Sequence, residues 1–288
     1  MTANKVVLIT GANGFIGSRL AELEKSSGSK VVKMDRELLY LPKELKAFIE
    51  QLKPNSIYHL AAYGNHYHQK NVEEIVASNY MATFNLLNAS KESGFDCFIN
   101  IGSSSEYGTK TLPMSESDLP EPLTFYGATK VGSNYLARAF AIEMNLPIVN
   151  VRPFSVYGPN EANERFIPRI INSAVQRKPL TLSVGVHDWI FIDDFVDALR
   201  CVEKNISILS GQTVNVGTGE QFSNLEVVKM IEKVMGTQIE ITSVPGLRKF
   251  DTAISWVADI SKLKSLGWKN NHSLMEGLVK TVNARTAN

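Results

Sequence analysis

Tyr126 and Lys130 are the two residues whose types and spacing are best suited to moving a proton. They stand four residues apart in Thr124-Phe-Tyr-Gly-Ala-Thr-Lys130, a segment that predicts the start of a long helix. Side chains at positions i and i+4 share a helix face. A phenol has a pKa of about 10, so it needs a nearby cation to act as an acid/base at neutral pH. An ammonium about 4 Å away attracts a phenolate by roughly 4 kcal/mol, enough to lower the phenol pKa by up to about 3 units.

A glycine-rich loop near the start of the chain predicts a nucleotide site. Lys5 to Thr10 predicts a strand, Gly11-Ala-Asn-Gly14-Phe-Ile-Gly17 a loop, and Ser18 to Lys25 a helix. Such glycines allow a tight turn, a close approach of pyrophosphate and close helix packing. The spacing is one residue longer than the usual dinucleotide fingerprint. We therefore expect these cofactor-binding residues: Gly11, Asn13, Gly14, Phe15, Ile16 and Gly17.

The next predicted strand, Val31 to Met34, ends at Asp35. An acid at this place in a dinucleotide fold binds the adenosine ribose hydroxyls, which favours NAD. Arg36 follows it and would suit the 2′-phosphate of NADP, so NADP stays an alternative.

The elements that must position these groups alternate between strand and helix. Further strands are predicted at Ser56 to Leu60, Cys97 to Ile101 and Leu146 to Val151, and helices at Pro42 to Lys53, Val72 to Ser93 and Tyr126 to Met144. This alternation predicts an α/β fold, a Rossmann-like doubly wound parallel sheet with a smaller α/β C-terminal substrate lobe. We expect residues 1–152 to form the dinucleotide-binding domain, to which later strands can return. Residues 153–288 then form mainly the substrate lobe.

Hydroxyls and guanidinium groups follow the later strands. Gly102-Ser103-Ser104-Ser105-Glu106-Tyr107-Gly108 comes directly after one strand, and Arg152 ends the next. Ligands of α/β sheets bind beyond the carboxyl ends of the strands, so a functional serine is expected here. Arg152 and Arg165 are the candidates for a nucleotide diphosphate, because guanidinium forks match phosphate oxygens. Gly217-Thr-Gly219 has no third glycine and predicts a turn.

Composition excludes several classes of function. The 288 residues are 44% apolar and have a formal charge of +1, which gives no case for nucleic-acid or membrane binding. Two cysteines and the absence of a signal-like N-terminus indicate a cytoplasmic protein. His59, His66 and His68 lack a nearby acidic or thiolate partner, so no metal site is predicted. Residues 75–90 carry no charge, which predicts a covered helix and a homodimer.

Taken together, the chain resembles the extended short-chain dehydrogenase/reductase family, in its nucleotide-sugar epimerase, dehydratase and ketoreductase branch. The resemblance rests on the glycine loop and Asp35, His59-Leu60-Ala61-Ala62, Asn79, Ser103 to Gly108, Tyr126-x-x-x-Lys130, Arg152 to Pro159, Trp189 to Asp194 and Leu266-Gly-Trp268. It implies that Leu60, Ala61, Ala62 and Asn79 line the cofactor with Tyr126 and Lys130. It also implies that Tyr126 is the acid/base, that Lys130 holds the nicotinamide ribose, and that Ser103 is the catalytic hydroxyl, with Ser104 as the fallback.

Departures from the family pattern reduce the number of candidate reactions. Related 4,6-dehydratases have an acid one or two positions after the catalytic hydroxyl, where this chain has Ser104 and Ser105, so dehydration is disfavoured. His187 replaces an arginine that assists nucleotide binding in many relatives. Ser104, Ser105 and His187 therefore join Arg152 and Arg165 as predicted substrate-binding residues. The prediction is an NAD(P)-dependent 4-ketoreductase of a 4-keto-6-deoxy nucleotide sugar. The alternatives are a nucleotide-sugar 4-epimerase and a non-catalytic dinucleotide sensor.

Overall fold

The computed structural model describes residues 5–244 and 254–287, which form two compact units. The first unit runs up to residue 108 and includes residues 119–152 and 198–214. The second contains residues 109–118, 153–197 and those from 215 onward. The chain thus leaves the first unit after Arg152 and returns to it at Ala198.

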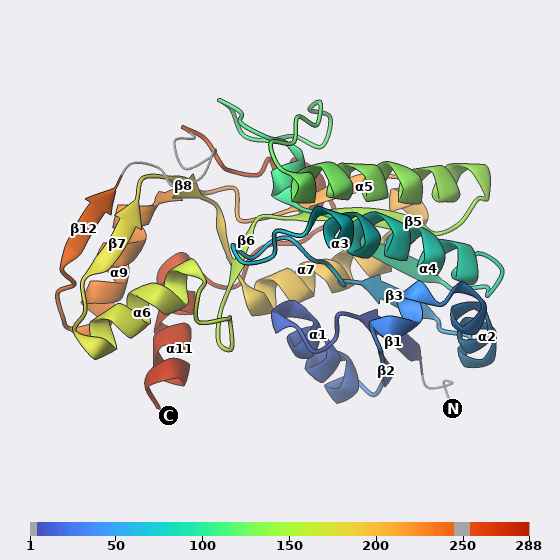
Figure 1. Ribbon diagram of the computed structural model, residues 1–288, viewed down its shortest axis with the longest axis horizontal. Coiled ribbons are helices and arrows are strands. Elements are labelled where there is room, and N and C mark those ends of the chain that lie inside the picture. Colours follow the sequence, from blue (N-terminus) through green and yellow to red (C-terminus); the bar gives the residue numbers. More distant parts are fainter. Residues whose placement is uncertain (1–4, 245–253, 288) are drawn as a thin grey trace. The chain divides into compact units, whose positions relative to one another are not determined.

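A six-stranded sheet forms the centre of the first unit, in the order β10-β5-β4-β3-β1-β2. Strands β1, β2, β3 and β5 of this sheet are labelled in Figure 1. Strands β1 to β5 pair in parallel with their neighbours. Strands β3 and β4 are buried at every residue, as expected for a parallel sheet covered by helices. The Rossmann-like α/β fold predicted from the sequence is therefore confirmed. The strands are β1 Val6–Thr10, β2 Lys30–Met34, β3 Ser56–His59, β4 Cys97–Ile101, β5 Ile148–Pro153 and β10 Thr213–Val216.

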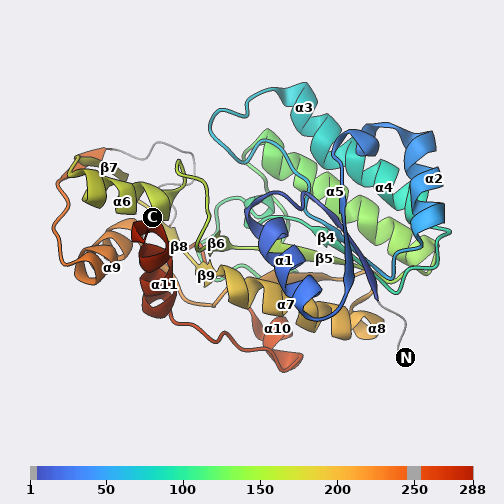
Figure 2. The same ribbon diagram turned by 90° about the horizontal axis from the view of Figure 1, so that it is seen from below.

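Helices cover both faces of this sheet (Figure 2). Helices α2, α4 and α5 bury Ile49, Leu86 and Phe140 in one core together with residues of β1, β3 and β4. On the other side, Nε of Arg200 in α7 donates to Glu24 of α1 at 3.0 Å. The helices are α1 Phe15–Ser26, α2 Pro42–Leu52, α3 Val72–Val76, α4 Ala82–Ser90, α5 Phe125–Glu143, α7 Ile192–Lys204 and α8 Ile206–Leu209, with short turns at Glu37–Tyr40 and Ser104–Glu106.

The single helix predicted over Val72 to Ser93 is interrupted. A π-helical turn, Ala77–Met81, lies between α3 and α4. Such a turn holds one residue more than the α-helical turns around it and is often found at functional sites. Asn79 lies in this turn and is fully buried. Its amide holds a loop and a neighbouring helix, as described below.

The second unit is built from helices and three two-stranded sheets. Helix α9 packs against α6 and α11. The sheets pair β11 with β8, β12 with β7 and β6 with β9. Their strands are β6 Ser155–Tyr157, β7 Leu180–Ser183, β8 Val186–His187, β9 Trp189–Phe191, β11 Phe222–Ser223 and β12 Ile241–Val244, and the helices are α6 Phe166–Gln176, α9 Asn224–Met235, α10 Ser261–Ser265 and α11 Leu274–Thr286. Among the described residues, no helix is both long and apolar enough to span a membrane.

Glu161 is an acidic residue buried in the second unit. Its side chain is only 5% exposed, and Nε of Arg165 lies 3.4 Å from its Oε1. Its Oε2 has no hydrogen-bond partner within the described part of the chain. Burial raises the pKa of Glu161 to about 7, although the charges of Arg165 and Arg285 oppose this shift.

This raised pKa predicts a loss of stability as the pH rises. Between the ordinary glutamate pKa of 4.5 and about 7, the folded protein holds a proton that the unfolded chain has released. Unfolding therefore becomes easier across this range, by on the order of 1 to 3 kcal/mol. We expect Glu161→Gln to gain stability over the parent at pH 8 and to lose that advantage at pH 4.5, as measured by urea unfolding. Glu220→Gln, at an exposed site, should follow the parent. Parallel pH profiles of Glu161→Gln and the parent would contradict the prediction.

Candidate active site

The strand order creates a ligand site at the ends of β1 and β3. Strand β2 lies on one side of β1, and β3 lies on the other. The connections leaving β1 and β3 therefore separate, and ligands of doubly wound sheets bind at such a switch point. A cavity of about 180 Å³ lies there. It is lined by Gly11, Gly14, Arg36, Leu39, Tyr40, Leu60, Ala61, Ala62 and Ser78.

The glycine loop has the close contacts expected of a phosphate-binding turn. Gly11 has φ +65°, and a Cβ there would lie 2.8 Å from the backbone nitrogen of Ala61. A Cβ on Gly17 would lie 2.3 Å from the carbonyl oxygen of Gly11. Any side chain at these two positions would push the loop away from β3 and from the start of α1. The residues therefore fit a dinucleotide whose pyrophosphate lies against the backbone.

The other predicted cofactor residues near this loop are not among those that line the cavity, so their contact with the cofactor stays a prediction. Phe15 and Ile16 begin α1. Asn13 is exposed, and its Oδ1 accepts a hydrogen bond from Lys33 at 3.3 Å. Asp35 is exposed directly after β2, as required for an acid that binds ribose hydroxyls.

His59 forms part of a buried chain of hydrogen bonds rather than a group of metal ligands. Its Nδ1 lies 2.7 Å from Oγ1 of Thr10, and its Nε2 lies 3.0 Å from Oγ1 of Thr83. Thr83 donates its own hydrogen to the carbonyl of Asn79, so it accepts from the Nε2–H group of His59. Burial and the charge of Lys130 lower the pKa of His59 to about 3. His59 is therefore neutral, in the tautomer that carries its hydrogen on Nε2.

Asn79 extends this chain of hydrogen bonds to helix α5. Its Oδ1 accepts from the backbone N–H of Tyr63, and its Nδ2 donates to the carbonyl of Tyr63 and to Oγ1 of Thr129. The amide therefore joins the loop after β3 to α5. Asn79 does not line the cavity described above, so its predicted contact with the cofactor stays a prediction.

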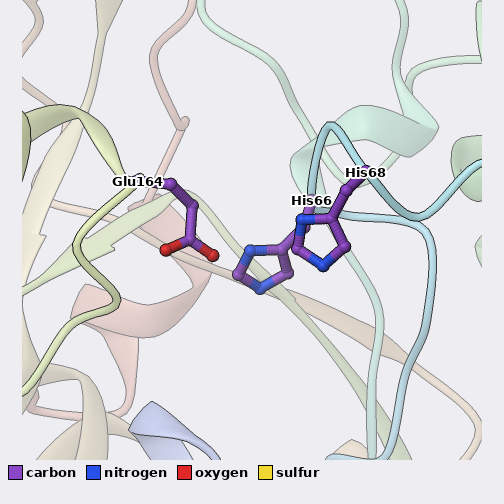
Figure 3. A group of neighbouring side chains, drawn as sticks. All are labelled: His66, His68 and Glu164. Atoms are coloured by element: carbon purple, nitrogen blue, oxygen red, sulfur yellow. The ribbon is translucent and has the colours of Figure 1, made fainter.

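His66 and His68 lie in the loop after β3, with ring centroids 5.5 Å apart (Figure 3). Metal sites in proteins take three or four convergent donors. Two imidazoles alone do not supply them, and we assign no metal to this pair. Glu164, also drawn in Figure 3, belongs to the second unit, and we do not count it as a metal ligand of this pair.

Tyr126 and Lys130 lie in the first two turns of α5, as the spacing predicted. Nζ of Lys130 is 6.0 Å from the centroid of the Tyr126 ring and donates to the carbonyl of Ile101 at 2.8 Å. Lys130 is only 2% exposed. Burial lowers its pKa to about 8, and the charge of Glu106 opposes that change. At neutral pH, Lys130 therefore keeps most of its positive charge beside the tyrosine.

The serine segment forms a short turn after β4 that contacts the start of α5. Oγ of Ser103 accepts from the backbone N–H of Ser105 at 3.1 Å. Ser103 and Ser104 are buried, and Ser105 is half-buried. A Cβ on Gly127 would lie 2.6 Å from the carbonyl oxygen of Ser105. Glycine at 127 therefore brings the residue next to Tyr126 against the serine turn, a contact for which we recognised no signal in the sequence.

Glu106 is the functional residue that sequence reasoning missed. It is fully buried and accepts from the backbone N–H of Ser103 at 2.8 Å, from Nδ2 of Asn134 at 3.1 Å and from Nε of Arg152 at 2.8 Å. The guanidinium of Arg152 also lies 4.5 Å from the ring centroid of Tyr107. Arg152 is thus committed to a buried ion pair, and we do not carry forward its predicted contact with a diphosphate.

Two predicted substrate residues belong to the second unit. Arg165 is half-buried beside Glu161, and the ring of His187 lies 5.4 Å from that of Trp189. The neighbouring Asp188 accepts from the backbone N–H groups of Thr218 and Gly219. The backbone donors of the Gly217-Thr-Gly219 segment therefore bind a carboxylate of the protein itself.

Comparisons with known proteins agree on one family. The model of the family described as "NAD dependent epimerase/dehydratase family" matches residues 7–217. The chain is 31% identical to the "uncharacterized UDP-glucose epimerase YtcB" of Bacillus subtilis, over 96% of each chain. It is 26% identical to the dTDP-glucose 4,6-dehydratase of Neisseria meningitidis, over 96% of this chain and 92% of the relative.

A solved structure is similar over nearly the whole length. The UDP-glucuronic acid 4-epimerase of Bacillus cereus, in complex with UDP-glucuronic acid and NAD, superposes with a TM-score of 0.84. The two sequences are 29% identical, and the match covers 98% of this chain and 100% of that one.

The buried position of Glu106 predicts a large effect of removing its charge. In Glu106→Gln, Arg152 would stay buried without a counter-charge, so we expect a loss of about 3 to 5 kcal/mol in the free energy of unfolding. Urea unfolding measures this loss. Glu50→Gln, at an exposed site, should change stability by about 0.5 kcal/mol or less. Replacing both partners, in Glu106→Gln with Arg152→Met, should restore part of the loss. A Glu106→Gln protein as stable as the parent would show that the ion pair is not needed.

Proposed function

The chain belongs to the NAD dependent epimerase/dehydratase family, and we propose that it is a nucleotide-sugar 4-epimerase that binds NAD in the cavity beyond β1 and β3. The observation that carries this proposal is the pair formed by Tyr126 and a charged, buried Lys130, on a helix whose first turn contacts the serine turn. The family match supports NAD as the cofactor.

The relatives favour epimerisation over the ketoreductase predicted from the sequence. Two relatives carry the names UDP-glucose epimerase and UDP-glucuronate 4-epimerase, and the match to this chain covers 94% or more of each relative. None of the similar proteins described above is named as a stand-alone ketoreductase. The 4-epimerase, the alternative left open by the sequence, therefore becomes the proposed activity, with a UDP-sugar as the proposed substrate.

The serine turn argues against dehydration. Water elimination needs an acid/base pair besides the tyrosine. The positions after Ser103 are Ser104 and Ser105, and the nearest acid, Glu106, is fully buried with both its oxygens bound. No carboxylate of this turn is therefore available to move a second proton. The chain thus lacks at this turn what its dehydratase relatives are expected to use.

The proposed chemistry divides between the cofactor and the protein. Bound NAD supplies reversible hydride transfer. Tyr126 takes the proton from a sugar hydroxyl and returns it, and Lys130 makes this possible by favouring the phenolate. The hydrogen bond from Ser105 uses a lone pair of Ser103 Oγ, so Ser103 can donate its own hydrogen to the same sugar oxygen. Ser103 thereby steadies the oxygen while Tyr126 moves the proton.

The nucleotide part of the substrate is assigned to the second unit. We propose that Arg165 contacts the diphosphate, since its side chain is 31% exposed and a guanidinium matches phosphate oxygens. His187, which by the resemblance replaces an arginine of the family pattern, keeps its proposed role in binding the nucleotide. A neutral imidazole is the weaker phosphate partner.

We also propose that two copies associate through α4 and α5. Phe84 is 36% exposed, while Tyr135 and Ile142 are 53% and 58% exposed. The two helices pack together, and the rings of Phe84 and Phe140 meet edge to face at 6.4 Å. Phe84 lies in the uncharged stretch predicted to be covered, and together with the exposed apolar side chains of α5 it faces solvent in a single chain, so a second copy would cover them.

The activity is tested with UDP-glucose and UDP-glucuronic acid as substrates. We expect the C4 epimer of one of them to form without net consumption of cofactor, as followed by chromatography and by absorbance of reduced nicotinamide. Tyr126→Phe should lower the rate by about 100- to 10,000-fold, because it cannot move the proton. Tyr135→Phe, on the same helix, should keep the parent rate. Stoichiometric oxidation of NAD(P)H with a 4-keto-6-deoxy sugar, and no isomerisation, would favour the ketoreductase instead.

Dimer formation is tested by introducing a charged side chain on the exposed apolar face of α5. Tyr135→Glu should convert a dimer into a monomer in light scattering, because it would place a carboxylate in an apolar interface. Val279→Glu, at an apolar site 38% exposed on α11, should stay dimeric. A parent protein that is monomeric at micromolar concentrations would contradict the proposed dimer.

A further inference from the structure

Arg36 lines the cofactor cavity but is bound to other side chains. Its Nη2 donates to Oε1 of Glu74 at 2.9 Å and to Oγ of Ser78 at 2.7 Å. Its Nε lies 3.4 Å from the hydroxyl of Tyr40, and its guanidinium lies 5.6 Å from the ring centroid of Tyr63. All of these residues belong to the first unit.

The two bonds of Nη2 remove the geometry that a phosphate needs. A guanidinium binds a phosphate through two neighbouring nitrogens, either Nε with Nη2 or Nη1 with Nη2. Both pairs include Nη2, and this nitrogen carries only two hydrogens. In this chain one hydrogen is donated to Glu74 and the other to Ser78. Arg36 therefore offers no complete fork to an incoming phosphate.

The local charges act in the same direction. Glu74 neutralises Arg36 at 2.9 Å, and Asp35 adds a further negative charge after β2. A 2′-phosphate carries about two negative charges at neutral pH, so the carboxylates of Glu74 and Asp35 repel it. The 2′-hydroxyl of NAD is uncharged and is not repelled.

We propose that Glu74 is a specificity-determining residue, which excludes NADP by keeping Arg36 engaged. Arg36 by itself would suit the 2′-phosphate, as the sequence indicates. Its partner on α3 converts it into part of the wall of the cavity. The inference rests on the proposed function in one respect, because it requires the dinucleotide to bind in this cavity.

Glu74 can be changed without disturbing its helix. The backbone N–H of Glu74 is bound by the side chain of Asn71, which caps α3, and this bond does not involve the glutamate side chain. Glu73 provides a matched control, because it is an exposed acid in the same first turn. It stands on the same helix with the same charge, and no bond to Arg36 is recorded for it within the described residues. A general effect of charge should therefore appear in both variants.

The experiment measures which dinucleotide the protein retains. Each protein is incubated with an equimolar mixture of NADH and NADPH and separated from free nucleotide by gel filtration, and the bound nucleotides are quantified. Relative to the parent, Glu74→Ala should raise the ratio of NADPH to NADH about tenfold, and Glu74→Gln about threefold, because glutamine can still accept a hydrogen bond. Glu73→Gln should leave the ratio within about twofold of the parent. Adding Arg36→Gln to Glu74→Ala should abolish the gain.

The outcomes separate this inference from the proposed function. If the parent retains NADH and Glu74→Ala leaves the ratio unchanged, the inference is wrong while the cofactor site stands. An equal rise in Glu73→Gln, or a rise that persists without Arg36, would also overturn it. A parent protein that retains neither dinucleotide would overturn the proposed function and, with it, this inference.

Discussion

The active site depends on how the buried charge of Lys130 is balanced. An ammonium that is almost wholly removed from water loses its proton unless a negative charge supports it. Glu106 supplies that charge and at the same time pairs with Arg152 and binds the backbone of Ser103. One carboxylate therefore helps to keep the lysine charged and holds the serine turn in place. A tyrosine beside an uncharged lysine would have no reason to lose its proton near neutral pH.

The same charge contributes to the neutral state of His59, after burial. Burial, and in second place the positive charge of Lys130, disfavour the imidazolium, so the histidine is neutral and can link Thr10 to Thr83 in one direction. Through Thr83 and Asn79, this chain connects the end of β1, next to the glycine loop, with α5. The glycine loop and α5 are thus joined by neutral hydrogen bonds in a region that also holds the buried Lys130.

The roles of Arg36 and Arg152 depend on the carboxylates that bind them. Arg152 is bound to Glu106, and Arg36 is bound to Glu74 and Ser78. Both had the position in the sequence expected of a phosphate ligand. In each case the partner comes from an element distant in the sequence. Arg36 is left without a free fork, whereas Arg152 is held through Nε and its buried Nη1 has no hydrogen-bond partner within the described residues. A carboxylate that already binds an arginine therefore makes that arginine a poorer phosphate ligand.

The amino-acid sequence alone determined the α/β fold, the glycine loop, the place of Asp35 after β2 and the spacing of Tyr126 and Lys130. These are local properties: alternating strand and helix patterns, glycine positions and the helical repeat act over a few residues. Tertiary structure decided the rest. It introduced the π-helical turn at Asn79, brought Glu106 close enough to act on the charge of Lys130, and gave both Arg36 and Arg152 their partners. Those outcomes depend on which residues share a buried space after packing, because a charge or hydrogen-bond donor removed from water must find a partner there, and sequence distance does not say which partner that will be.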